Sequence, residues 1–143
     1  MLVNELMTRE VEIIGPNDTL AEAARKMAKL DVGALPVAEA ERLVGMITDR
    51  DIAVRAVAEG MGPDTPVRDA MTIDVRYAYE DELISDVADN MGELQVRRLP
   101  VVSRDKRLVG IISLGDIARL NEPTDAGEAL QGISRPGGMH NNA

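Results

Sequence analysis

The chain has 143 residues, is 45% hydrophobic and carries a formal net charge of −9. Its size allows one ordinary core, while its negative charge disfavours nucleic acid and anionic membrane surfaces as partners. With no cysteine and a single histidine, His140, in a Gly/Asn-rich tail, the chain has no disulfide, no thiol nucleophile and no thiolate metal site.

The first half of the chain alternates apolar segments with turn signals. In chain order the pattern predicts a strand, a helix, two strands and a helix, over residues 11–14, 20–27, 35–37, 43–47 and 51–58. Thr19 or Asp18 can cap the first helix, whose predicted buried face carries Leu20, Ala23, Ala24 and Met27. The N-terminus lacks a secretion signal and no run of about eighteen apolar residues occurs, so we expect a cytoplasmic protein.

The second half repeats the first. Met71 lies 64 positions after Met7, and Pro100 lies 64 positions after Pro36. The helix face returns as Ile84, Val87, Ala88 and Met91, followed by strands over 99–102 and 108–112 and a helix over 116–120. We therefore predict a first repeat over 3–59, a hinge-like linker over 60–66 and a second repeat over 67–121. Residues 122–143 are predicted to form a weak helix over 125–131, capped by Thr124, and a flexible tail.

The helix predicted over Asp51–Ala58 is apolar on almost every side. A helix of this kind is usually covered on more than one face, and one chain offers little cover. This favours a homodimer. The alternative is that small alanine side chains are tolerated in water.

Two matching motifs follow the last strand of each repeat. Each motif has a glycine, two apolar residues, a hydroxyl residue and, three positions after the hydroxyl residue, an aspartate. The hydroxyl residue and the aspartate are Thr48 and Asp51 in the first motif, and Ser113 and Asp116 in the second. A hydroxyl beside the free amides of a helix start can bind an anion such as phosphate. An aspartate three residues later can accept hydrogen bonds from a ribose diol. The preceding glycines, Gly45 and Gly110, would leave room for a ligand close to the backbone.

The same spacing has a structural interpretation. A hydroxyl and an acidic residue three positions apart form a capping box, which satisfies the free amides of a helix start without any ligand. Capping boxes favour Glu or Gln at the acidic position and do not require a preceding glycine. From the spacing alone, both interpretations stay open.

Both repeats resemble cystathionine-β-synthase (CBS) domains. The resemblance spans about residues 3–120 and rests on the Leu35-Pro36-Val37 and Leu99-Pro100-Val101 segments and on the two hydroxyl–aspartate motifs. It implies an α+β fold in which two β-α-β-β-α repeats pack as a pseudo-two-fold pair, that is, a stand-alone Bateman module. It also implies two clefts for adenine nucleotides, a regulatory role and a dimer.

The resemblance also implies roles for particular residues. Asp51 and Asp116 would bind ribose, while Thr48 and Ser113 would bind phosphate. The residues that match the lining of the clefts are Thr8, Val32, Gly33, Thr72, Val96 and Arg97. The second cleft is the better candidate for phosphate, since Leu114-Gly115 replaces Asp49-Arg50 and the Arg97-Arg98 pair is near.

The predicted function is that of a regulatory sensor. AMP, ADP or ATP would bind, and no metal would be required. Binding would change the conformation of this chain, and an unidentified partner protein would respond to that change. The alternative is a ligand-independent dimerisation or docking module. An enzyme is not expected, because no nucleophile–base pair, Cys/His metal cluster or phosphate loop with its lysine is present.

Overall fold

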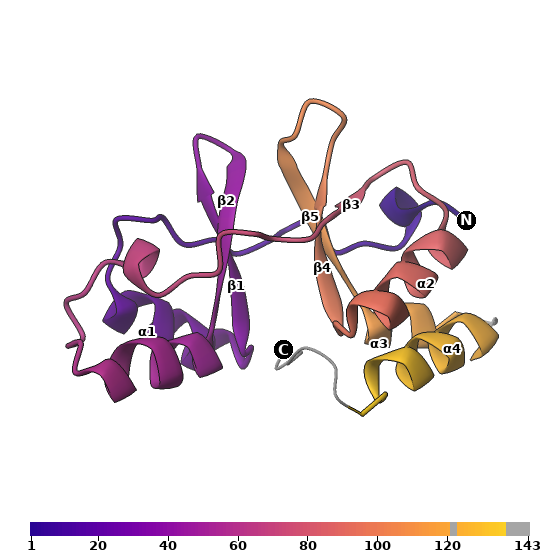
Figure 1. Ribbon diagram of the computed structural model, residues 1–143. Coiled ribbons are helices and arrows are strands. Elements are labelled where there is room, and N and C mark those ends of the chain that lie inside the picture. Colours follow the sequence, from indigo (N-terminus) through magenta and orange to yellow (C-terminus); the bar gives the residue numbers. More distant parts are fainter. Residues whose placement is uncertain (121–122, 137–143) are drawn as a thin grey trace. The chain divides into compact units, whose positions relative to one another are not determined.

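The computed structural model describes residues 1–120 and 123–136. The side chains of residues 123–126 lie outside this description, as do residues 137–143, which include His140 and the predicted tail. The chain divides into two compact units (Figure 1). The first-repeat unit consists of residues 12–75, and the second-repeat unit consists of Met1–Val11 with the described residues from Arg76 onward. The segment Met1–Val11 therefore packs with the second repeat, although it precedes the first.

The first-repeat unit packs helices against a two-stranded antiparallel sheet. Its α1 begins at Thr19, whose Oγ1 accepts a hydrogen bond from the Glu22 amide, so the predicted cap is confirmed. Leu35, Val37 and Ile47 of the sheet are buried in its core. Its elements are α1 (Leu20–Leu30), β1 (Ala34–Glu39), β2 (Arg42–Thr48), the π-helical turns η2 (Asp51–Ala56) and the 3-10 turns η3 (Val57–Glu59) and η4 (Val67–Asp69).

The second-repeat unit has a three-stranded sheet in the order β3-β4-β5 and more helix than its counterpart. The predicted helix face is confirmed, because its four apolar residues are all buried. Its elements are η1 (Val3–Glu5), β3 (Ala78–Tyr79), α2 (Ile84–Leu94), β4 (Arg98–Val102), β5 (Leu108–Ser113), α3 (Leu114–Ala118) and α4 (Pro123–Ile133). Helices and sheets occur together in both units, which confirms the α+β class.

The strand predicted over residues 11–14 is wrong. Only Ile14 pairs, in parallel with Val37 of β1. The next bond of a parallel ladder would need an amide proton from Pro16, which has none. In the second repeat the equivalent residue is Glu80, whose amide donates to the Val102 carbonyl at 3.0 Å. One proline therefore reduces the first strand to a single bridge, while β3 forms in the second repeat.

The linker over residues 60–66 is held by α1. The Leu20 amide donates to the Thr65 carbonyl at 2.9 Å, and the Ala21 amide donates to the Pro63 carbonyl at 3.0 Å. These are amides of the first helical turn, which have no partner within the helix itself. The linker thus completes the start of α1.

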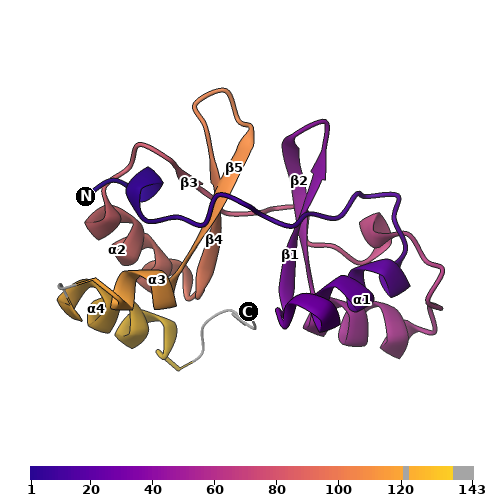
Figure 2. The same cartoon turned by 180° about the vertical axis from the view of Figure 1, so that it is seen from behind.

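The C-terminal helix α4 is longer than predicted and packs beside α2, as both views show (Figures 1 and 2). Thr124 lies inside α4, so its prediction as a cap is wrong. The buried Gln95 side chain donates to the Gly132 carbonyl at 3.0 Å and to the Arg135 carbonyl at 2.9 Å. The described part of the first-repeat unit has no helix equivalent to α4. Ala24, predicted as buried, is accordingly exposed, whereas its counterpart Ala88 is buried.

Replacing Gly132 with alanine should destabilise the protein. A Cβ at Gly132 would overlap the backbone of Gly92 on α2, and overpacking of this kind costs about 1–3 kcal/mol. Gly127 on the same helix has open space around its Cβ position, so Gly127→Ala should stabilise by about 0.5–1 kcal/mol through helix propensity. Urea denaturation measures both free energies of unfolding. Equal values for the two variants would contradict the close packing of α4 on α2.

Candidate functional site

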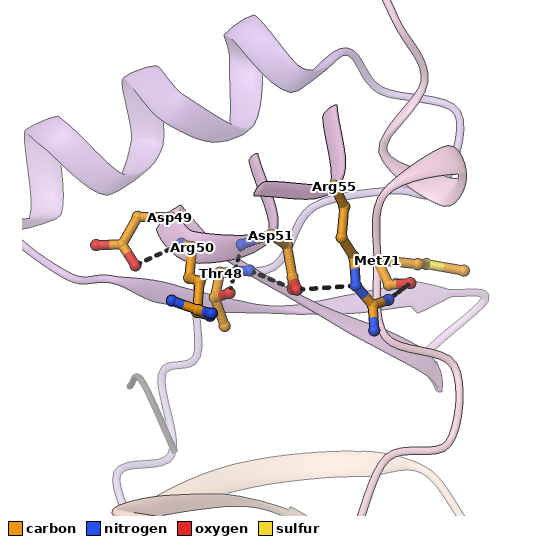
Figure 3. A network of polar contacts seen from close by, with 6 residues as sticks. All are labelled: Thr48, Asp49, Arg50, Asp51, Arg55 and Met71. Atoms are coloured by element: carbon orange, nitrogen blue, oxygen red, sulfur yellow. Dashed lines mark hydrogen bonds and ion pairs between the residues drawn. The ribbon is translucent and has the colours of Figure 1, made fainter. Parts of the chain in front are cut away.

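In the first-repeat unit, β2 ends at a residue pair that caps the following helix. The Asp51 amide donates to Thr48 Oγ1 at 3.0 Å, and the Thr48 amide donates to Asp51 Oδ2 at 3.0 Å (Figure 3). Asp51 is buried, with only 8% of its surface exposed to solvent. We call the segment Thr48–Asp51 the first junction.

The second-repeat unit has the same arrangement at the end of β5. The Asp116 amide donates to Ser113 Oγ at 3.1 Å, and the Ser113 amide donates to Asp116 Oδ2 at 2.9 Å. We call Ser113–Asp116 the second junction. The capping interpretation of the sequence is therefore confirmed at both junctions. In each case the box uses only one carboxylate oxygen, Oδ2.

The other carboxylate oxygen, Oδ1, faces an arginine at both junctions. Arg55 Nε lies 3.6 Å from Asp51 Oδ1, and Arg55 Nη1 donates to the Met71 carbonyl at 3.3 Å (Figure 3). Arg119 Nη1 donates to Asp116 Oδ1 at 3.4 Å. Sequence reasoning missed Arg119. Its position three residues after an aspartate on a predicted helix was the available signal.

The segments before β1 and β4 lie against the junctions. The Asp49 amide donates to the Gly33 carbonyl at 2.9 Å, and the Leu114 amide donates to the Arg97 carbonyl at 2.7 Å. The preceding residues, Val32 and Val96, are half-buried and pack partly against the core of their own unit. The structure thus groups the predicted residues Val32 and Gly33 with the first junction, and Val96 and Arg97 with the second.

The two remaining predicted threonines, Thr8 and Thr72, each pack in the unit of the other repeat. Thr72, which opens the second repeat, donates its amide to the Met46 carbonyl of β2 at 2.8 Å and accepts from the Met46 amide at 3.0 Å. Thr8, which opens the first repeat, makes the same pair of bonds with Ile111 of β5, at 2.9 and 3.0 Å. Each unit therefore combines a junction with the threonine that opens the other repeat.

The crossing of these segments explains why each motif has a glycine. A Cβ at Gly45 would lie 2.8 Å from the Thr72 carbonyl oxygen, and a Cβ at Gly110 would lie 2.8 Å from the Thr8 carbonyl oxygen. Real Cβ atoms are not found this close to backbone. The space predicted for a ligand is therefore occupied by Met71–Thr72 beside Gly45 and by Met7–Thr8 beside Gly110. We call each of these two-residue stretches a crossing segment.

The two junctions differ in charge. The first junction carries the exposed Asp49 and Arg50, where the second has Leu114 and Gly115. In the sheet register, Ser113 lies opposite Arg98, whereas Thr48 lies opposite Ala34. Arg98 Nε is buried without a hydrogen-bond partner among the described residues. With Arg97 and Arg119, the second junction is the more cationic of the two.

The two tyrosines form a separate cluster near the turn between β4 and β5. Their rings meet edge to face at 5.5 Å, Arg104 lies over the Tyr79 ring, and Lys106 donates to the Tyr77 hydroxyl at 2.6 Å. This hydrogen bond lowers the pKa of Tyr77, and the hydrogen bond from Arg104 lowers the pKa of Asp81. The tyrosines are thus engaged with these cations.

Over residues 1–120 and 123–136, no helix is long and apolar enough to cross a membrane. The same part of the chain contains no group of three or more His, Cys, Asp or Glu side chains arranged to hold a metal ion.

Comparison with known proteins decides the family. The family model described as the CBS domain matches residues 3–57 and 67–122. The chain belongs to the CBS-domain family. The CBS domain-containing protein YhcV of Bacillus subtilis is 42% identical over 134 residues, which cover 92% of this chain and 94% of YhcV.

Three solved structures match the fold. The crystal structure of Hypoxic Response Protein I with two coordinated zinc ions has a TM-score of 0.76 at 38% identity, covering 83% of this chain and 98% of that one. The CBS pair of protein MJ0100 in complex with 5-methylthioadenosine and S-adenosyl-L-methionine has 0.73 at 32%, covering 83% and 94%. CBSX2 in complex with AMP has 0.73 at 26%, covering 82% and 93%.

Replacing Gly45 with alanine should destabilise the CBS pair by about 1–3 kcal/mol, because the new methyl group would force Thr72 and Met71 away from β2. Gly62→Ala is the matched control, since its Cβ position has open space. Thermal unfolding followed by circular dichroism compares the two variants. A Gly45→Ala protein as stable as the control would refute the close crossing of the Thr72 segment.

Proposed function

We propose that this CBS pair is a regulatory protein that binds an adenine nucleotide (AMP, ADP or ATP) at one or both junctions and signals by conformational change to a partner protein. The observation that carries the proposal is the meeting, in each unit, of a hydroxyl and a carboxylate oxygen, Oδ1, that the capping box does not use. CBS pairs in complex with AMP and with S-adenosyl-L-methionine support the ligand class.

The donor set at the junctions suits a nucleotide. Thr48 Oγ1 and Ser113 Oγ accept hydrogen bonds in the capping boxes, so their own hydroxyl protons remain available for a phosphate oxygen. Oδ1 of Asp51 and of Asp116 can accept from a ribose hydroxyl. The residues proposed to line the sites are Val32, Gly33 and Thr72 at the first junction and Thr8, Val96 and Arg97 at the second.

The second junction is the better proposed phosphate site. Its arginines Arg97, Arg98 and Arg119 have one acidic neighbour at the junction, Asp116, whereas the first junction has both Asp49 and Asp51. Phosphate binding favours the more cationic surroundings because charge-assisted hydrogen bonds to arginine are stronger than neutral ones. The proposal requires no metal.

Asp116→Ala should weaken AMP binding about tenfold or more, since a hydrogen bond to a charged group contributes about 1.5–3 kcal/mol. Asp51→Ala should have a smaller effect on AMP if the second junction is the tighter phosphate site. Isothermal titration of AMP, ADP and ATP into the wild type and both variants measures this, with thermal unfolding as the control for loss of the cap. If titration of the wild-type protein with AMP, ADP and ATP gives no heat of binding, the proposal is refuted.

The capping boxes specifically favour one other function, a ligand-independent dimerisation or docking module. The variants Asp51→Glu and Asp116→Glu separate the two, because a capping box accepts glutamate at this position while a ribose site suffers from the added methylene. Stable variants with weakened AMP binding support the nucleotide sensor. The lack of a nucleophile–base pair in the sequence supports a regulatory role in place of a catalytic one.

We also propose a homodimer formed through the first-repeat unit. Val54 and Val57, on the helix after the first junction, are 47% and 65% exposed. In the second-repeat unit, α4 covers α2, and Ala88 and Ala129 belong to the same buried cluster. A second copy of the chain would give the first-repeat helices the cover that α4 gives their counterparts.

Val57→Glu should therefore shift the protein from dimer to monomer, because a carboxylate would be buried in the proposed interface. Leu130→Glu on α4, at a similarly exposed apolar position of the other unit, is the matched control. Sedimentation equilibrium measures the dissociation constant of each variant. A monomeric wild-type protein, or equal weakening by the two substitutions, speaks against this interface.

A further inference from the structure

Each junction has an arginine at a different place in the sequence. Arg55 is four residues after Asp51, whereas Arg119 is three residues after Asp116. In the alignment of the two junctions, Leu120 takes the place of Arg55 and Val54 takes the place of Arg119. Both guanidinium groups nevertheless reach the same atom of their aspartate, Oδ1. The arginine–aspartate contact therefore occurs in both units, although the two arginines are at non-equivalent positions of the repeat.

These arginines compete with a diol for the same oxygen. The capping box fixes Oδ2 of each aspartate at the backbone amide of Thr48 or Ser113, so Oδ1 is the oxygen left for a ribose hydroxyl. A sugar bound there would meet the guanidinium already in place.

The ion pairs are easy to break. Their separations are 3.6 Å at the first junction and 3.4 Å at the second, and the arginine side chains are 54% and 79% exposed. An exposed ion pair of this kind contributes little to stability, because water screens the two charges. Ribose hydroxyls can thus replace the arginine at Oδ1 at little cost. The arginine itself remains fully charged beside the ligand.

We infer that Arg55 and Arg119 are exchangeable counter-ions, which pair with Asp51 and Asp116 in the absence of ligand and with the phosphate of a bound nucleotide when the ribose takes Oδ1. The inference rests on the proposed function and adds the chemical selection made at that site. A guanidinium group pairs with phosphate oxygens through directed N–H donors. The arginine therefore selects nucleotides over the corresponding nucleosides, which displace it and leave it without an anion.

At the first junction the exchange also reaches the crossing segment. Arg55 Nη1 donates to the carbonyl of Met71, the residue before Thr72 (Figure 3). Thr72 is the residue that pairs with Met46 of β2. When Arg55 turns to a phosphate, η2 loses this bond to the crossing segment. Ligand binding at Asp51 is thereby transmitted to the chain that leads into the second repeat.

The test compares AMP with adenosine. Arg55→Ala in the Asp116→Glu background, which silences the second junction and keeps its cap, should lower AMP affinity about tenfold and leave adenosine affinity equal or higher. Arg55→Lys keeps the charge and should recover part of the AMP affinity. Arg25→Ala, an exposed arginine on α1 of the same unit, is the matched control. Isothermal titration with the two ligands gives the ratio of their dissociation constants for each variant.

Arg119→Ala in the Asp51→Glu background applies the same comparison to the second junction. An AMP-to-adenosine affinity ratio that falls about tenfold with either arginine variant, and not with Arg25→Ala, supports the exchange. Binding of both ligands with an unchanged ratio overturns the inference and leaves the proposed function standing. A wild-type protein that binds neither ligand overturns both.

Discussion

The segment that opens each repeat lies across the last sheet strand of the other repeat, and this crossing ties the two halves of the sequence together at both sheets. Thr72 pairs with Met46, and Thr8 pairs with Ile111, each through two backbone hydrogen bonds. Gly45 and Gly110 permit the crossing, because any side chain there would overlap the crossing backbone. Each unit therefore contains, beside its own last sheet strand, the segment that opens the other repeat.

The aspartates of the junctions serve stability and proposed binding with different oxygens. Oδ2 of Asp51 and of Asp116 accepts from a backbone amide and closes a capping box, while Oδ1 meets an arginine. This division removes the conflict between the two interpretations of the motif. A carboxylate that caps its helix with one oxygen has a second oxygen, so helix capping and the proposed recognition of a sugar can share one side chain.

The two repeats have the same framework and different surroundings. Pro16 limits the first sheet to two strands, whereas the amide of Glu80 supports a third strand in the second. Asp49 and Arg50 stand at the first junction where Leu114 and Gly115 stand at the second. Only the second-repeat unit has α4 against its helices among the described residues. These differences divide the proposed roles, with phosphate binding favoured at the second junction and self-association at the exposed helices of the first-repeat unit.

The sequence by itself determined the duplication, most strands, the cap at Thr19 and the hydroxyl–aspartate pairs, because these depend on periodicity and on contacts between residues three or four positions apart. Only the tertiary structure decided that Thr8 and Thr72 each pair with a strand of the other repeat and that Gly45 and Gly110 face backbone. It also decided that Ala24 is exposed while Ala88 is buried, and that α4 packs against α2. Each of these depends on neighbours far away in the chain. A local pattern records that a residue is small or apolar, and the fold decides what lies against it.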